Sequence, residues 1–419
     1  MNFTKIGYKL SRKNVINKVY LTCLSIVMVY GLFSCHNEQT LSGERINLFG
    51  NQGRTNSYKT FGAFLINTSE NEKINAIDSS GSMVAPLAVS SYQTVFATVE
   101  GTIHQFSSAR VEWSAKLDST AFVIAGMCAD NNHNIYAVAS DGCIYSISSE
   151  GKRRFKTVIS SDETASFKDL LALSDGIIIS QTKGLISKLS FEGKILWQFK
   201  STLSPVNTAS ADWQNNIYVS LTFDDYSGND SLLCLSTTGK LNWAIGFTST
   251  RILTSPIVGN NNIILGVVQS ENKPLILSID FHGNLLWNNE LRATPRGISI
   301  TAEGSIITVS YNSGIGISQS VIEQFSPKGK SDWHIKFDSR MVSPALIGND
   351  NIAIIGVKSS AIGVYLLHRN GILDTFFSIE TAPSLLLKPV VAPNGNIIFA
   401  GSHKGYITRV GVKKGLLPI

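Results

Sequence analysis

The sequence is poor in charge and in cysteine. Only 16% of its 419 residues are Asp, Glu, Lys or Arg, whereas 43% are hydrophobic. This composition indicates a chain that buries much of itself rather than a disordered one. The five cysteines form no Cys-x-x-Cys and no Cys-Cys pair. The sequence therefore lacks the cysteine motif that predicts a zinc ribbon or thioredoxin-like redox chemistry.

Motifs for catalysis are missing as well. HExxH, GxSxG and the phosphate-binding P-loop do not occur, and the seven histidines are scattered along the chain. Gly314-Ile315-Gly316 lacks the third glycine of a dinucleotide fingerprint and is interpreted as a hairpin. Asp224–Asp230 is rich in oxygen ligands that suit calcium, but its spacing does not match an EF-hand, and a solvated hairpin is favoured. The sequence predicts no enzyme, no metal site and no cofactor.

The N-terminus reads as a targeting segment. Residues 1–20 contain five basic and no acidic side chains, and the apolar run Leu21–Phe33 is too short to span a bilayer, as in a signal peptide. It ends in Leu32-Phe33-Ser34-Cys35, which resembles the bacterial lipobox. That resemblance implies a signal peptide at 1–34, a lipid such as palmitate on Cys35, and, with His36 next, sorting to the outer membrane, facing the periplasm or the surface. The alternative is ordinary cleavage nearby, with Cys35 incidental.

Removing this segment changes the charge balance. The whole chain has 36 Lys and Arg against 30 Asp and Glu, a net charge of +6. Without the five basic residues before Cys35 the count is 31 against 30, about +1. A nucleic-acid partner therefore has no electrostatic support. The polar residues 35–58 are expected to form a flexible tether.

From residue 59 to residue 419 the chain repeats one unit. A turn rich in Asn, Asp, Gly or Ser, followed by a strand that begins with Ile or Val, occurs eight times. The Ile or Val residues that begin successive copies are 40 to 46 residues apart. Most copies follow a proline, and most contain a glycine turn with an aromatic residue four positions later, as in Gly239–Trp243. Four short strands in such a unit predict an all-β, eight-bladed β-propeller of antiparallel blades. Cys128 and Cys143 fall on the first and third strands of one unit, so free thiols are expected.

The two chain ends are predicted to meet. The last unit lacks its outermost strand, and Lys73–Ile77 aligns with the strand that contains Trp243. Pairing these N- and C-terminal segments would close the ring and remove an open edge.

The repeat resembles the quinoprotein-type, or PQQ-like, β-propeller unit, which ends in D-x-x-G-K-x-x-W. Asp280–Trp287 matches it, and Ser148, Ser190, Ser236 and Ser326 replace the Asp in other copies. In that family the Trp docks against the adjacent blade. The resemblance therefore assigns a docking role to the following aromatic residues: Trp113, Phe155, Trp197, Trp243, Trp287, Trp333 and Phe376. Thr375 holds the Trp position in the seventh unit, and Trp213 lies outside the register.

Basic residues precede several of the proline-led strands. They are Lys200, Arg251, Arg292, Arg296, Arg340 and Lys388. In a propeller these connections gather on one face, so a basic arc there would suit an acidic partner surface. The alternative is ordinary solvated loops.

Lipobox, tether and propeller together resemble the lipoprotein subunit of the outer-membrane β-barrel assembly machinery. The resemblance implies a monomeric, non-enzymatic scaffold of the cell envelope that binds another envelope protein through its loops. A carbohydrate- or ligand-binding envelope propeller remains an alternative. A quinoprotein-type dehydrogenase is disfavoured, since the vicinal cysteines of that enzyme class are missing.

Overall fold

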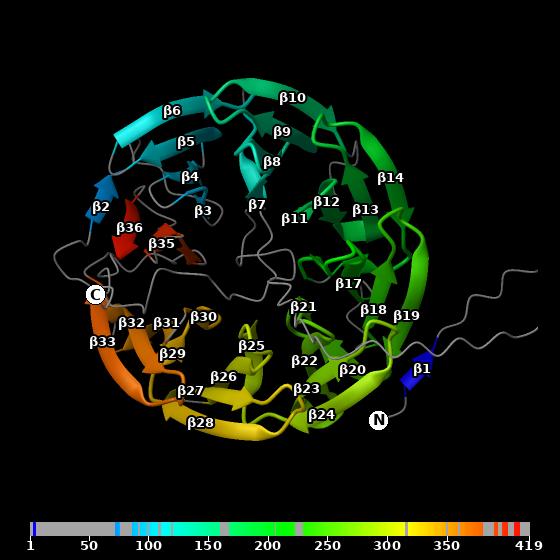
Figure 1. Cartoon of the computed structure of the whole chain (residues 1–419), viewed down its shortest axis with the longest axis vertical. Coiled ribbons are helices and arrows are strands. Elements are labelled where there is room, and N and C mark those ends of the chain that lie inside the picture. The colour runs from blue at the N-terminus through cyan, green and yellow to red at the C-terminus, as the bar shows by residue number, and fades with distance from the viewer. Residues whose placement is uncertain are drawn as a thin grey trace, which may run out of the picture.

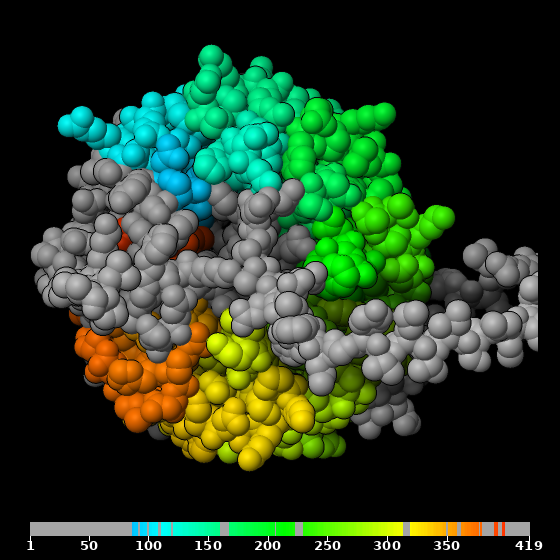
Figure 2. Space-filling model, viewed as in Figure 1, coloured from blue at the N-terminus to red at the C-terminus, as the bar shows by residue number. Residues whose placement is uncertain are grey.

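The computed structural model describes residues 3–5, 72–75, 86–90, 93–98, 100–107, 110–118, 120–159, 167–205, 207–222, 229–314, 317–348, 351–358, 361–379, 389–392, 396–400 and 406–410. The strands in these residues form eight antiparallel sheets, numbered 1 to 8 below. Figure 1 shows the sheets arranged around a circle in chain order. In Figure 2 the colours of successive sheets adjoin one another from cyan through green and yellow to orange.

The first four sheets have these strands. Sheet 1 contains β3 (Leu87–Ala88), β4 (Gln93–Ala97), β5 (Thr102–Ser107) and β6 (Arg110–Lys116). Sheet 2 contains β7 (Val123–Ala129), β8 (Ile135–Ala139), β9 (Cys143–Ile147) and β10 (Arg153–Val158). Sheet 3 contains β11 (Phe167–Leu173), β12 (Gly176–Gln181), β13 (Leu185–Leu189) and β14 (Ile195–Lys200), with the 3-10 turn η2 (Thr182–Gly184). Sheet 4 contains β15 (Ser204–Pro205), β16 (Ser210–Ala211), β17 (Ile217–Thr222), β18 (Ser231–Leu235), β19 (Leu241–Phe247) and the distant β1 (Phe3–Lys5).

The other four sheets repeat the pattern. Sheet 5 contains β20 (Thr250–Ile252), β21 (Ile257–Val258), β22 (Ile263–Gln269), β23 (Lys273–Ile279) and β24 (Leu285–Glu290), with the 3-10 turn η3 (Ser270–Asn272). Sheet 6 contains β25 (Thr294–Ile300), β26 (Ile306–Gly314), β27 (Ile317–Phe325) and β28 (Ser331–Phe337). Sheet 7 contains β29 (Arg340–Met341), β30 (Leu346–Ile347), β31 (Asn351–Lys358), β32 (Ala361–His368) and β33 (Leu373–Ile379). Sheet 8 contains β34 (Val390–Val391), β35 (Ile397–Ala400), β36 (Tyr406–Val410) and β2 (Glu72–Asn75).

Sheet 8 is built from both ends of the chain. β2 pairs with β36, with Glu72 opposite Arg409 and Asn75 opposite Tyr406. β2 thus supplies the outermost strand that the last repeat lacks, and its residues overlap the segment that sequence alignment selects for this position.

The core lies between neighbouring sheets. Middle strands such as β9 and β18 are buried along their whole length, because each sheet packs against two neighbours. Outer strands such as β14 and β24 alternate between exposed and partly buried positions. One hydrophobic cluster joins sheets 1 and 2, and another joins sheets 6 and 7.

The expectation of free thiols is confirmed for the described cysteines. Cys128 on β7 and Cys143 on β9 are separated by β8, and both are buried free thiols, as is Cys234. Burial raises the pKa of the Cys234 thiol to about 11, which keeps it protonated and unreactive at neutral pH. Trp213, outside the tryptophan register, is 56% exposed.

Candidate functional site

The tryptophans of the outer strands dock on the following sheet. In five junctions the indole Nε1–H donates a hydrogen bond to a backbone carbonyl of the turn between the third and fourth strands of that sheet. The bonds are Trp113 to Ser149 (2.9 Å), Trp197 to Thr237 (3.0 Å), Trp243 to Phe281 (2.8 Å), Trp287 to Pro327 (3.1 Å) and Trp333 to Arg369 (3.1 Å). Each of these hydrogen bonds joins two neighbouring sheets.

The residues of the receiving turns, which accept the tryptophan hydrogen bonds, follow from the geometry of these turns. Gly239 has a φ of +79°, and a Cβ added there would lie 2.5 Å from Cδ2 of Trp197. Only glycine satisfies both conditions. Asp280 accepts hydrogen bonds from the backbone N–H of His282 (2.9 Å) and of Asn284 (2.8 Å). A serine hydroxyl at that position, as in Ser236 with the N–H of Lys240 at 3.1 Å, accepts the second bond, which accounts for Ser in place of Asp.

Two members of the predicted docking set differ from the rest. The Phe155 side chain has no hydrogen-bond donor. Two residues later, the Thr157 hydroxyl donates to the Gly193 carbonyl of sheet 3 at 2.9 Å. Phe376 packs on Tyr365 of its own sheet, with ring centroids 4.5 Å apart. Thr375 occupies the tryptophan position of that sheet, opposite Leu366.

Each junction has two ends, and the two ends lie on opposite faces of the ring. The turn face contains the receiving turns, such as 236–240 and 280–284. The connection face contains the links from an outer strand to the first strand of the next sheet, at 201–203, 248–249, 291–293 and 338–339. Because strands alternate in direction within every sheet, all such links emerge on one side.

Five of the six predicted basic residues are described, and all are exposed at or beside these links. Lys200 ends β14, Arg251 lies in β20, Arg292 precedes β25, Arg296 lies in β25, and Arg340 begins β29. Lys388 lies outside the described residues. The side chains belong to successive parts of the ring, and their grouping as a partner-binding arc stays a prediction.

Their surroundings are unequal. The Arg292 guanidinium forms an ion pair with Glu323, whose side chain is fully buried, and the Arg292 N–H donates to the other carboxylate oxygen at 3.2 Å. The guanidinium carbon of Arg340 lies 6.0 Å from the centre of the Tyr311 ring. Lys200 donates to the Lys183 carbonyl. Arg292 therefore neutralises a buried carboxylate, a structural role that sequence reasoning missed because Glu323 lies 31 residues away.

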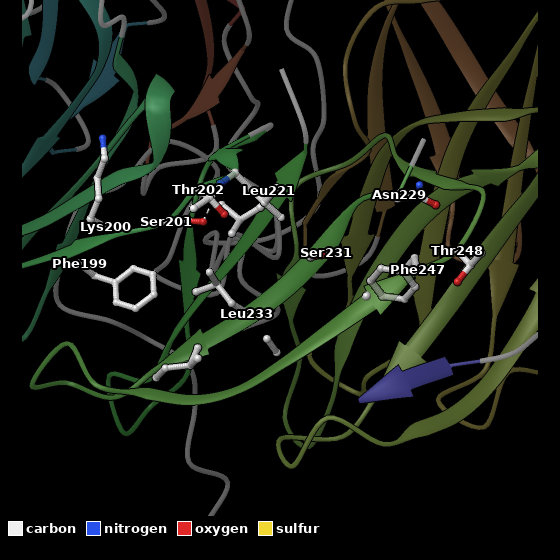
Figure 3. A pocket seen from close by; sticks show the side chains of 14 residues that line it. Phe199, Lys200, Ser201, Thr202, Leu221, Asn229, Ser231, Leu233, Phe247 and Thr248 are labelled. Atoms are coloured by element: carbon white, nitrogen blue, oxygen red, sulfur yellow. Dashed lines mark hydrogen bonds between the residues drawn. The ribbon is translucent and has the colours of Figure 1, made fainter. Parts of the chain in front are cut away.

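A groove opens between sheets 3 and 4 at this face (Figure 3). It encloses about 660 Å³ and is lined mainly by apolar groups, among them Phe199, Leu221, Leu233 and Ala244. Among the described residues that line it, Lys200 is the only charged one. The volume falls in the range that ligand sites occupy.

The groove lies where a small residue replaces the large apolar residue of the other junctions. Four residues beyond the docking aromatic, other junctions place a large buried side chain, namely Leu117, Ile159, Phe247, Leu291 or Phe337. The junction of sheets 3 and 4 has Ser201 there. The positions are equivalent because the Ser201 N–H donates to the Gly184 carbonyl as the Phe247 N–H does to Asp230. A signal for the groove was thus present in the repeat alignment.

Two repeated polar clusters were not predicted from the sequence. In sheet 2 the Asp130 carboxylate accepts hydrogen bonds from Asn134 (2.8 Å) and the Tyr136 hydroxyl (2.7 Å). Asp212 does the same with Asn216 and Tyr218 in sheet 4, at 2.8 Å each. Burial raises the pKa of both tyrosines. They stay protonated and act as hydrogen-bond donors within the core.

No metal-binding or membrane-spanning feature is present in the part of the chain that the structure describes. Those residues contain no cluster of three or more His, Cys, Asp or Glu. They also contain no helix of the length and apolarity that a bilayer crossing requires. Residues 224–228 of the acidic segment lie outside them, and Asp230 is buried and accepts the Ile252 N–H at 2.7 Å. Cys35 also lies outside the described residues.

Comparison with known proteins gives a family and a fold. A family model described as outer membrane protein assembly factor BamB matches residues 182–416. No curated protein matches the sequence. The structure is similar to that of BamB from Moraxella catarrhalis, with a TM-score of 0.58 and 14% identity over 81% of this chain and 98% of that one.

Two other solved structures share the fold. A structure of the Dos1 propeller has a TM-score of 0.60 and 10% identity over 81% of this chain and 94% of that one. A streptogramin B lyase structure has a TM-score of 0.50 and 12% identity over 82% and 97% of the two chains. At these identities the likeness is one of fold: an all-β propeller of antiparallel sheets.

Proposed function

We propose, from the premise that this chain belongs to the outer membrane protein assembly factor BamB family, that it is a non-enzymatic scaffold of the cell envelope. In this proposal Cys35 is lipidated, residues 35–58 tether the propeller to the outer membrane, and its connection face binds a protein partner of outer-membrane assembly. The family match over residues 182–416 is the observation that carries it. The docking tryptophans are occupied between sheets, which leaves the loops for binding.

The propeller in this proposal is an eight-bladed, closed ring that acts as a monomer. Its eight sheets correspond to the blades, and the pairing of β2 with β36 closes the ring. Such a closure ties the two chain ends together and leaves no open sheet between the last blade and the first. A rigid ring presents loops from several blades to one partner surface.

Affinity capture from detergent-solubilised envelopes tests the partner. The tagged protein is expected to recover a β-barrel assembly subunit, and Arg296→Glu with Arg340→Glu should lower that recovery by about tenfold because the partner surface is acidic. Lys328→Glu with Lys330→Glu is the matched control, since it makes the same charge change at exposed positions on the turn face. No recovery of an assembly subunit by the unsubstituted protein would refute the proposal.

Lipidation has its own test. Palmitate labelling in the host is expected for the unsubstituted chain and not for Cys35→Ala. Labelling that persists in Cys35→Ala would place the lipid elsewhere and remove this part of the proposal.

An enzymatic role is the second candidate, since one structural neighbour is a streptogramin B lyase. The described residues contain no cluster of three acidic, histidine or cysteine side chains to support metal catalysis. A carbohydrate- or ligand-binding propeller is the other alternative. Turnover of a streptogramin, or dye reduction with alcohols or sugars in the presence of quinone and calcium, would overturn the scaffold assignment.

A further inference from the structure

β19 differs from the other outer strands in having no charge. Its sequence is Leu-Asn-Trp-Ala-Ile-Gly-Phe. Every other outer strand contains at least one Lys, Arg, Asp or Glu, as the residues of β6, β10, β14, β24, β28, β33 and β2 show. Charged side chains on an outer strand discourage the addition of a further strand, and β19 has none.

A further strand is in fact paired with this edge. β1 lies antiparallel to β19, with Phe3 opposite Phe247, Thr4 opposite Gly246 and Lys5 opposite Ile245. Figure 1 shows β1 on the outside of β19. β1 belongs to the segment predicted to be a signal peptide. The Phe247 N–H donates to the Asp230 carbonyl within sheet 4, and because the backbone groups of successive strand residues point to alternate sides, those of Gly246 face β1. Removal of β1 would leave this outward-facing part of the edge open to another strand.

The same stretch of β19 borders the groove between sheets 3 and 4. Ala244, Gly246 and Phe247 line that groove, and Ile245 and Phe247 also belong to the hydrophobic cluster shared with sheet 5. Directly opposite residues of an antiparallel pair place their side chains on the same face. A residue opposite Gly246 in an added strand therefore faces the groove, where neither Gly246 nor Ser201 supplies a large side chain.

We propose that the edge of β19 and the adjoining groove form a strand-addition site for an extended segment of a partner protein. The partner strand takes the place of β1, runs antiparallel to β19, and puts an apolar side chain opposite Gly246. Backbone hydrogen bonds supply affinity and the groove selects the side chain. This proposal rests on the proposed scaffold function and names the chemistry of one partner segment.

Peptide binding to the full chain tests the site. All proteins carry Thr4→Pro, which removes a backbone donor and vacates the edge whether or not residues 1–34 are retained. The probe is a fluorescent peptide of residues 1–8, and a second probe has Leu in place of Thr4. Anisotropy is expected to show saturable binding of both, with the Leu peptide bound about tenfold more tightly because its side chain enters the groove.

Two variants separate the edge from the groove. Gly246→Lys puts a charged side chain on the groove-facing side of the edge, where a strand would pair, and should weaken both peptides by at least about tenfold. Gly246 does not have a positive φ, so the backbone accepts this residue. Ser201→Leu fills the groove as Leu291 does in its own junction, and should abolish the advantage of the Leu peptide while the original peptide still binds. Circular dichroism of each variant checks that the fold is retained.

Three results of these experiments would overturn the strand-addition site. Equal binding of both peptides to the Gly246→Lys and reference proteins would overturn the site. The site would also be overturned if neither peptide bound but the groove bound an anionic apolar dye, and Ser201→Leu abolished that dye binding. This result would identify a small amphiphile as the occupant. If envelope capture of an assembly subunit succeeds while these peptide tests fail, the scaffold function stands and the strand-addition site does not.

Discussion

The junction between sheets 3 and 4 and the junction between sheets 4 and 5 are alike at one end and different at the other. At the turn face both use a tryptophan that donates to a turn carbonyl, Trp197 to Thr237 and Trp243 to Phe281. At the connection face one has Ser201 and an open groove, and the other has Phe247, which is 2% exposed. The repeated end fixes neighbouring sheets in place, so the other end is free to differ. Function is therefore best sought at the connection face.

The largest expected effect is at the repeated end. Trp243→Ala should lower the free energy of unfolding by about 3–5 kcal/mol, because it removes a large packed ring and leaves the Phe281 carbonyl without its donor. Denaturant unfolding followed by circular dichroism measures the change. Trp213→Ala is the control, since that side chain is 56% exposed and its loss should cost less than about 0.5 kcal/mol. Equal costs for the two variants would show that docking does not hold the sheets together.

Substitutions at the connection face should make each junction resemble the other. Phe247→Ser is expected to destabilise by about 3 kcal/mol, because it opens a cavity in the cluster between sheets 4 and 5. Ser201→Leu is expected to stabilise by about 1 kcal/mol, because apolar surface then fills an existing groove. Thermal unfolding of both variants checks the signs. Destabilisation by Ser201→Leu would mean that the groove has no room for this side chain.

The sequence predicts the repeated end better than the differing one. Glycine, tryptophan and the Asn-Ile turns recur at fixed spacing because every junction needs the same docking geometry, so the strands and docking corners can be read from the repeats. Ser201 and the charge-free β19 are departures from a repeat, and they become visible only when the units are compared position by position. The ion pair of Arg292 with Glu323 and the pairing of β1 with β19 join residues without any periodic signal. Three-dimensional structure was required for both.

The basic residues of the connection face should also separate into two kinds. Arg292→Ala is expected to cost about 1–3 kcal/mol, because it leaves the fully buried Glu323 carboxylate without its cation, with the penalty reduced by the partial exposure of Arg292. Arg296→Ala, at an exposed position, should cost less than about 0.5 kcal/mol. Urea unfolding of the two variants makes the comparison. If Arg292→Ala were as mild as Arg296→Ala, Arg292 would return to the set of candidate partner-binding residues.

The smallest effect concerns the junction of sheets 1 and 2, where ion pairs of Asp118 with Arg153 and Lys156 add to the apolar packing. Hydrogen bonds from Lys156, at 2.8 Å, and from Arg153 lower the pKa of Asp118 to about 2. A carboxyl with a lowered folded-state pKa stabilises the fold above its unfolded pKa of about 3.9, and that contribution is lost as the pH falls towards 2. The midpoint of urea unfolding should therefore decrease from pH 5 to pH 2 with a component that Asp118→Asn removes. Because Asp118 lies at the surface, 0.5 M salt should reduce this component in the unsubstituted protein. An identical pH profile for Asp118→Asn would show that these ions do not stabilise the junction.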